Sequence, residues 1–452
     1  MSSTLHKMRP VRVIFFSGLL WKRRLVFLAG AVSVAFAAIV FALLADGAGV
    51  FYKSWASRFP WLTLLVTPAG FVACVYLTRR YFDGAQGSGV PQVIASRGFR
   101  HRALRLKLLN VRIVIGKILL TSLAIAVGAS VGREGPTMQV GAGIMMMAAA
   151  YAGLGRGRGL VMAGSAAGIA AAFNTPLAGI IFALEEMVNS PSRRVNALII
   201  AAVVVAGLVS FMVFGHYVNF GSGTSVLTSW ADWAAVPLCA VIGGTAGGLF
   251  GLLMVALSSS SIVWINRLKA RRLWFAAGCG LAVAVAALLT DQFAAGTGYA
   301  ETKAMLEQGA RLPVWYAPVK LLTTLLSGVC GMAGGMIAPS LATGAGFGSL
   351  AHAVLPDVPF DALCVLAMAG YFAGVIQMPL TAFVIVMEMT SDTRMMLPLL
   401  TTALIASGIS RLINHEPLFH ALARNWAPER IFKPKPPRRK DSSSPGSGTA
   451  AG

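Results

Sequence analysis

The stretch GREGP at 132–136 places two opposite charges between two apolar runs, 113–131 and 138–151. Moving an ionised side chain into hydrocarbon costs about 3 kcal/mol even on a lenient scale, so an acid at membrane depth indicates function by default. The glycines and the proline also interrupt the helix, and interrupted backbone is tolerated inside a bilayer only where it lines a cavity or is buried in protein. The stretch therefore predicts that Glu134 lies in a transport pathway.

Two further glycine–proline breaks share this pattern, GSGVP at 87–91 and GGMIAP at 334–339. Proline suits the first turn of a helix because its missing N–H is not needed there, so each break predicts a helix start. A helix start presents free backbone N–H groups and the positive end of the helix dipole, equivalent to about half a charge. Several such ends pointed at one place form an anion site, to which the Ser88 hydroxyl adds a donor.

Glu134 then has two interpretations. An ionised carboxylate at a helix start can occupy the place of an anion and leave it when protonated, which makes it both a gate and a proton carrier. Alternatively, Glu134 is a helix-capping acid paired with Arg133.

Composition indicates an all-α polytopic membrane protein. Of 452 residues, 56% are apolar and 12% are charged, against about 25% charged in a soluble domain, and the mean hydropathy is +0.73. Five apolar stretches reach the length of roughly 17 to 25 residues that spans a bilayer, whereas others, such as 177–184, are too short alone. This mixture predicts discontinuous helices. The span-length stretches are 25–45, 61–77, 197–214, 234–256 and 273–289.

The net charge of +22 follows the membrane topology. Lysines and arginines gather between or beyond the apolar runs, which is the positive-inside pattern and predicts that both termini are cytoplasmic. Without a soluble domain to carry the charge, nucleic-acid binding is excluded. The expected segments are a basic lead-in (1–24), a transmembrane domain (25–425) and a disordered basic tail (426–452).

The transmembrane domain contains an internal repeat, with halves of about 25–215 and 230–425. Sliding the sequence by 203 positions brings glycines, two prolines, a lysine and a glutamate into one register, including Lys117 on Lys320 and Glu185 on Glu388. Ile337 falls on Glu134, and a shared structural cap would more naturally be duplicated than lost. An odd number of crossings in each half would invert the halves and place the substrate site between them.

The sequence shows no catalytic or metal-binding pattern. The six histidines lack metal spacing, and no nucleophile accompanies the acids of the apolar region, Glu134, Glu185, Glu186 and Glu388. We therefore expect a protein that is not an enzyme and that uses no cofactor or metal. A purely structural membrane protein is disfavoured, because it would not need three breaks aimed at an anion.

The three breaks, with FNTPLAGIIFALEE (173–186) and its mate PLTAFVIVMEMT (379–390), resemble the CLC chloride channels and proton/chloride antiporters over roughly residues 20–425. The resemblance implies a CLC-like inverted repeat of discontinuous and tilted helices without cytoplasmic CBS domains. It also implies a homodimer with one Cl⁻ pathway per subunit in the bacterial inner membrane. By motif, the anion-binding residues would be Ser88, Gly89, Arg133, Glu134, Gly135, Met336, Ile337 and Phe419.

The resemblance also assigns roles to two acids. Glu134 would be the outer gate, and Glu186 falls where the antiporters of the family keep an inner proton glutamate, although a solvated helix end is an equally good interpretation of Glu186 from the residues alone. Having both acids favours H⁺/Cl⁻ exchange over a passive voltage- or pH-gated chloride channel. Two positions depart from the family pattern: Ile337 replaces a phenylalanine, and Phe419 replaces a tyrosine whose hydroxyl helps to bind the central anion.

Overall fold

The structure is a computed structural model that describes residues 18–99, 102–151, 157–186, 193–215, 220–223, 226–259 and 269–426. Within these ranges the secondary structure is helical, as predicted. The predicted tail lies outside the described residues except for Trp426, and so does the lead-in up to residue 17. Helix α2 already begins at Gly18, within the segment that was expected to precede the first span.

The helices of the first half are α2 (Gly18–Arg58), α3 (Thr63–Tyr81), α4 (Val90–Gly98), α5 (Arg102–Leu106), α6 (Val111–Ala126), α7 (Glu134–Tyr151), α8 (Gly157–Phe173), α9 (Pro176–Glu186) and α10 (Arg193–Phe214). Those of the second half are α11 (Ala235–Ser258), α13 (Arg272–Leu289), α14 (Tyr299–Glu307), α15 (Tyr316–Val329), α16 (Ile337–Val354), α17 (Phe360–Ile376), α18 (Pro379–Thr390) and α19 (Met396–Ile413). The short helix α20 (Leu418–Ala423) follows, and short 3-10 turns η1 (Pro60–Leu62), η2 (Asp232–Ala234) and η3 (Arg424–Trp426) adjoin longer helices.

Six helices of the described part are long and apolar enough to cross a membrane. They contain four of the five predicted spans; the fifth, 197–214, overlaps a shorter apolar helix. The other two are Ala103–Ala126, which overlaps the predicted apolar run 113–131, and Met396–Ile413. Lengths range from the 41 residues of α2 to the 11 residues of α9, which is the mixture of full and partial crossings that the sequence indicates.

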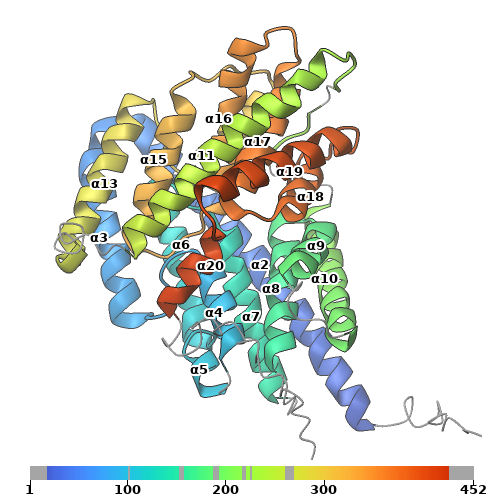
Figure 1. The fold of residues 1–452 in the computed structure, drawn as a ribbon. Helices are drawn as coiled ribbons and strands as arrows, with labels where there is room; N and C mark the ends of the chain where they lie inside the picture. The colour runs from blue at the N-terminus through green and yellow to red at the C-terminus, as the bar shows by residue number, and fades with distance from the viewer. Residues whose placement is uncertain are drawn as a thin grey trace, which may run out of the picture.

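The repeat is visible helix by helix. Adding 203 to the bounds of α7 gives the bounds of α16, and adding it to the bounds of α8 gives those of α17. The match persists for the starts of α9 and α18 and of α10 and α19. Figure 1 shows α7, α8, α9 and α10 gathered in one part of the molecule, with α16 and α17 in the other.

Backbone hydrogen bonds show that the halves meet around a local two-fold axis. Gly132 donates to the carbonyl of Gly335 at 2.7 Å, and Gly335 donates back to Gly132 at 2.8 Å. These glycines are repeat mates, and reciprocal bonds between equivalent residues are the mark of two-fold symmetry. Because the bridge is antiparallel, the chain enters α7 and α16 in opposite directions. The inverted repeat is therefore confirmed.

A second reciprocal contact joins α9 and α18. The Glu388 carboxylate accepts from the backbone N–H groups of Leu177 and Ala178 at 3.2 and 2.7 Å. Its mate Glu185 accepts from Leu380 and Thr381 at 3.3 and 2.7 Å. Each acid thus caps the helix start of the other half, where the first N–H groups have no partner within their own helix.

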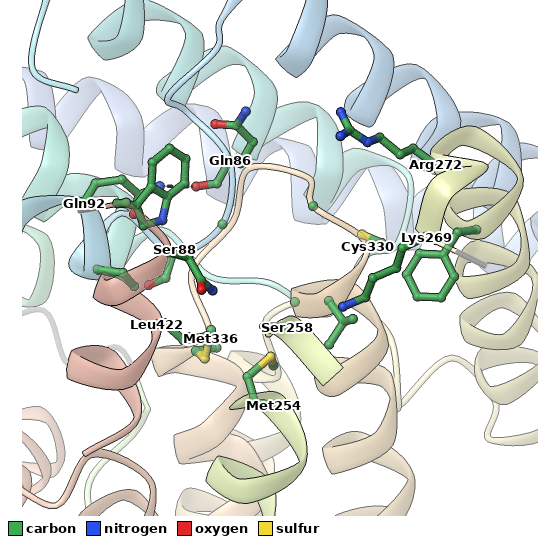
Figure 2. Close-up of a pocket in the computed structure, with 18 of the residues that line it drawn as sticks. Gln86, Ser88, Gln92, Met254, Ser258, Lys269, Arg272, Cys330, Met336 and Leu422 are labelled. Carbon is green, nitrogen blue, oxygen red and sulfur yellow. Dashed lines mark hydrogen bonds between the residues drawn. The ribbon is translucent and has the colours of Figure 1, made fainter. Parts of the chain in front are cut away.

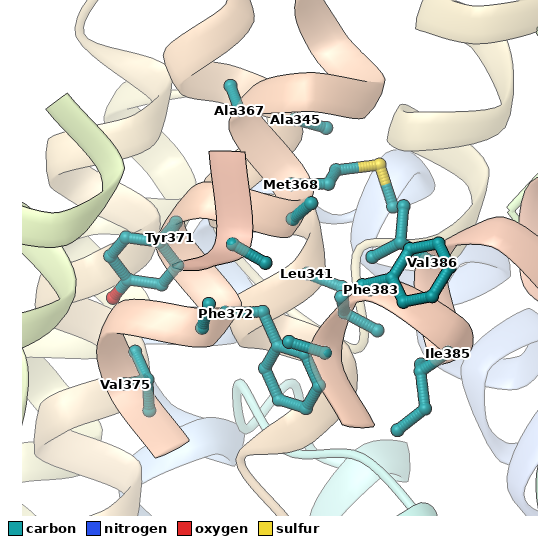
Figure 3. Packing of buried hydrophobic residues seen from close by; sticks show 14 of the residues in the cluster. Leu341, Ala345, Ala367, Met368, Tyr371, Phe372, Val375, Phe383, Ile385 and Val386 are labelled. Atoms are coloured by element: carbon teal, nitrogen blue, oxygen red, sulfur yellow. The ribbon is translucent and has the colours of Figure 1, made fainter. Parts of the chain in front are cut away.

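Small residues bring the helices of the core close together. A Cβ at Gly344 of α16 would meet the backbone of Met368 in α17 at 2.7 Å, so only glycine permits this approach. Figure 3 shows the aromatic and aliphatic side chains that fill the space beside it, including Tyr371, Phe372 and Phe383. In this packed frame the starts of α4, α7 and α16 have fixed positions.

Candidate ion pathway

The three glycine–proline breaks meet at the centre of the molecule. The GSGVP loop pairs with the third break through a bridge between Gly87 and Ala333, where Gly87 donates to Met332 at 2.7 Å and accepts from Gly334 at 3.1 Å. The second break pairs with the third through Gly132 and Gly335. As predicted, α4, α7 and α16 all begin at these breaks, so their unbonded N–H groups lie in one region.

Two buried lysines fix the loops that lead into this region. The Lys117 ammonium of α6 donates to the carbonyls of Ala85 and Gly87 at 2.8 and 2.6 Å, just before Ser88. Its repeat mate Lys320 of α15 donates to Ala295 and Gly296 at 2.8 and 2.7 Å, just before α14. Both ammonium groups are bound to backbone carbonyls, so neither lysine is available to pair with an anion at the helix starts.

The Glu134 side chain is fully buried and folds back toward α16. A Cβ added at Gly132 would collide both with the Glu134 carboxylate and with the side chain of Ala338, in the first turn of α16. The other carboxylate oxygen accepts a hydrogen bond from the Tyr299 hydroxyl. The Glu134 carboxyl group thus lies at the helix start where an anion would be bound.

The contacts of Arg133 extend beyond a helix-capping pair with Glu134. Its guanidinium forms an ion pair with Asp46 of α2 at 2.5 Å and donates to the carbonyl of Ala42 at 2.9 Å. It also lies 5.6 Å from the centre of the Tyr299 ring, close enough for a cation–π contact. These contacts link α2, α7 and α14 and brace the tyrosine that holds Glu134.

Ser88 faces the second break from the other side. A Cβ added at Gly135 would collide with the Ser88 hydroxyl, and one at Gly89 would lie 3.0 Å from the carbonyl of Gly135. Gly89 has a φ of 94°, a conformation that glycine adopts without strain. The buried Ser88 hydroxyl has no hydrogen-bond partner in the described structure, which leaves it free to donate to a bound ion.

Ser88 lines a cavity of about 650 Å³ that also reaches Met336 at the start of α16. Figure 2 shows Ser88 and Met336 facing this space, with Lys269 on its opposite side. Arg79 and Arg272 line it too, and no carboxylate is found among the described residues of its wall. A vestibule with this charge attracts anions and repels cations.

Phe419 is buried in the main hydrophobic cluster. The wall of the cavity near α20 is formed by Leu422, Asn425 and Trp426. Phe419 is not among the residues that line this cavity, and its side chain has no polar atom to donate to an anion, so its part in anion binding stays a prediction.

The second unmatched acid, Glu186, is the last residue of α9 and has a side chain only 3% exposed. Its Oε1 atom accepts a hydrogen bond from Arg97 of α4 at 2.6 Å. The same oxygen lies 3.5 Å from Nε2 of His420, on α20. Glu186 is thus a buried and paired carboxylate, which corrects the alternative expectation of a solvated helix end.

The structure therefore brings together Ser88, Gly89, Gly135 and the start of α16, and holds Glu186 in a separate cluster. Sequence reasoning missed Tyr299, although the segment GTGYA at 296–300 copies the pattern of GSGVP. The similarity was missed because these two segments lie 209 positions apart, whereas the rest of the repeat was found at an offset of 203. Nothing local in the sequence indicated Asp46, Arg97 or His420 as partners.

Buried charges on interrupted helices, within a protein that carries spans of membrane length, define a multi-pass membrane protein with an anion pathway. The family model for the voltage gated chloride channel matches residues 69–411. This match covers most of the sequence, so the chain belongs to that family, and it is a transporter protein rather than a member of an enzyme family.

Individual relatives agree with this assignment. The H(+)/Cl(-) exchange transporter ClcA of Vibrio vulnificus (strain YJ016) is 27% identical over 379 residues, covering 80% of this chain and 79% of the relative. Among solved structures, a slow cyanobacterial Cl-/H+ antiporter has a TM-score of 0.76 at 21% identity, covering 90% of this chain and 99% of its own. A CLC-type fluoride/proton antiporter has a TM-score of 0.72 at 23% identity, covering 88% and 98%. These structures share the fold.

Proposed function

We propose that the protein exchanges Cl⁻ for H⁺ across the bacterial inner membrane, and that Glu134 is the gate through which both ions pass. The observation that carries this proposal is the position of the Glu134 carboxylate at the start of α16, where Gly132 leaves room for it. Exchange by relatives that are named H⁺/Cl⁻ transporters supports the same activity.

In this mechanism Cl⁻ enters the basic vestibule and is bound by the Ser88 hydroxyl and by the backbone N–H groups of Gly89, Met336 and Ile337. The N–H groups of Arg133, Glu134 and Gly135 extend the binding path beyond it. Phe419 closes the inner end by its bulk. Helix ends suit this task because they attract an anion without a fixed cation that would hold it too tightly.

Protons and chloride compete at Glu134. When ionised, its carboxylate occupies the anion position at α16; when protonated, it loses the negative charge that the helix start attracts, and Cl⁻ can take its place. Glu186 receives the proton on the inner side. The Glu134 carboxylate must be charged to close the Cl⁻ path and neutral to open it. Proton binding at this one group therefore couples the movement of the two ions.

The proposal includes the assembly and orientation of the protein. Both termini are assigned to the cytoplasmic side, as the positive-inside pattern of lysines and arginines predicts. The protein is a homodimer with one pathway in each subunit. The exposed repeat mates Leu177 and Leu380, on α9 and α18, supply apolar surface for a contact between subunits.

Flux measurements on purified protein in liposomes test the exchange. A Cl⁻ gradient is imposed, and the external pH is recorded while a potassium ionophore sets the voltage. Exchange predicts uphill proton movement. Chloride flux that never drives protons would instead identify a passive channel, and the absence of flux of either ion would overturn the transport assignment.

A further inference from the structure

The cluster around Glu186 raises the question of how a proton reaches a carboxylate that is almost closed to water. Its side chain is 3% exposed, whereas that of Arg97 is 18% and that of His420 is 39% exposed. Among the described residues, these two side chains pair with the Glu186 carboxylate and are more exposed to solvent than it is. Arginine does not release a proton in proteins, while histidine titrates near neutral pH.

We propose that His420 is the entry residue for protons on the inner side, passing them from solvent to Glu186. The imidazolium transfers the proton on Nε2 to Oε1 of Glu186, leaving a neutral imidazole and a neutral carboxylic acid. The imidazole then takes a new proton from solvent. This inference rests on the proposed exchange function and adds a residue to it.

The geometry supports a relay rather than a fixed ion pair. The 2.6 Å bond from Arg97 is short and charge-assisted, whereas the 3.5 Å separation from His420 must close by about half an ångström to reach the usual N–H···O length. A small movement of α20 thus makes or breaks proton contact.

Among the described residues, three charged side chains act on His420. They are Glu186 from α9, Arg97 from α4 and Glu416 from the loop before α20, and Glu416 is itself paired with Arg424 at 2.8 Å. The sequences of α11 and α17, which also pack against α20, place no charged residue near it. The hydrogen bond to Glu186 raises the pKa of His420 above its ordinary value. A raised pKa extends upward the pH range in which the imidazole is protonated, and the supply of protons falls as the pH rises through that pKa.

Replacement of the histidine tests the relay in the full-length protein in liposomes. In His420→Ala, we expect proton turnover to fall by about tenfold or more while Cl⁻ turnover changes by less than twofold. Imidazole added on the inner side should restore proton turnover, because the space left by a partly exposed side chain opens to solvent. The isosteric variant His420→Gln should lose proton turnover without this rescue. His415→Ala, which removes an exposed histidine in the preceding loop, is the matched control and should behave like wild type.

Wild-type proton turnover should decline as the inner pH is raised, and this decline should be absent from the residual activity of His420→Gln. Unchanged proton turnover in both His420 variants would overturn the relay. So would an equal loss of Cl⁻ and proton turnover that imidazole does not restore, because that pattern marks a structural role. Failure of wild type itself to move protons uphill would instead count against the proposed exchange function.

Discussion

The two halves of the chain build the same helices but carry different acids. Glu185 and Glu388 are repeat mates, and each caps a helix of the opposite half. Glu134 and Glu186 have no acidic mate, since Ile337 and Met389 occupy the equivalent positions. The duplicated acids maintain the frame, and the unduplicated acids lie where ions would pass.

The lysines follow the same rule. Lys117 and Lys320 are mates and both hold loop carbonyls. The loops that they hold differ, because one carries Ser88 and the other leads to Tyr299. Symmetry thus constructs two similar scaffolds. One carries Ser88 of the proposed anion site, and the other carries Tyr299, which donates to Glu134.

The largest effect on transport is expected when the charge of Glu134 is removed. In Glu134→Gln, proton transport should fall by about a hundredfold or more while Cl⁻ flux remains, because the amide cannot carry a proton. Glu134→Ile, which makes the first half resemble the second, should do the same. Paired Cl⁻ and pH recordings in liposomes measure both effects. Glu307→Gln, a change in an exposed acid outside both clusters, is the control; persistent uphill proton movement in Glu134→Gln would reject the gate.

The second test acts on the other unmatched acid. Glu186→Gln should reduce proton turnover by about tenfold or more and leave Cl⁻ turnover within about twofold, because Glu186 lies apart from the anion-binding breaks. The same recordings apply. An equal loss of both fluxes would contradict the separation of the two paths.

The matched acids should behave as a pair. Glu185→Gln and Glu388→Gln should each destabilise the fold by about 1–2 kcal/mol, because each weakens the cap on one helix start. The two values should be close, with the larger loss in Glu185→Gln because Glu185 also accepts a hydrogen bond from the Thr381 hydroxyl at 2.6 Å. Coupled proton movement should persist in the folded fraction. Thermal unfolding in detergent measures the stability. Losses of stability that differ severalfold would show that the two caps, although similar in geometry, contribute unequally to the stability of the fold.

The smallest effect is expected at Tyr299. Tyr299→Phe removes the hydroxyl that holds the Glu134 carboxylate, a loss of about 1 kcal/mol, so Cl⁻ turnover at neutral pH should rise roughly fivefold. Stopped-flow Cl⁻ efflux is a suitable measurement. Tyr316→Phe, at a buried tyrosine that lies outside the described Glu134 contacts, supplies a matched control. A decrease in turnover would show that the hydroxyl serves the open gate instead.

Much of the architecture could be predicted because it follows from local rules. The helix starts at α4, α7 and α16 were marked by glycine and proline, and one sequence offset identified the repeat. The same reasoning did not find the partners of Glu134 and Glu186, since these come from α14, α4 and α20, far away along the chain. The sequence also indicated a separate lead-in up to residue 24, but α2 starts at Gly18 because its apolar run extends the helix through the preceding basic turn.

The sequence by itself determined a membrane protein with a duplicated set of broken helices and one acid that the repeat did not copy. These features depend on composition, on spacing and on residues that start helices, all of which are local. Only the tertiary structure decided that the Glu134 carboxylate lies at the start of α16 beside the Tyr299 hydroxyl, and that Glu186 lies beside Arg97 and His420. Such contacts depend on how distant helices pack, and packing is fixed by the whole fold.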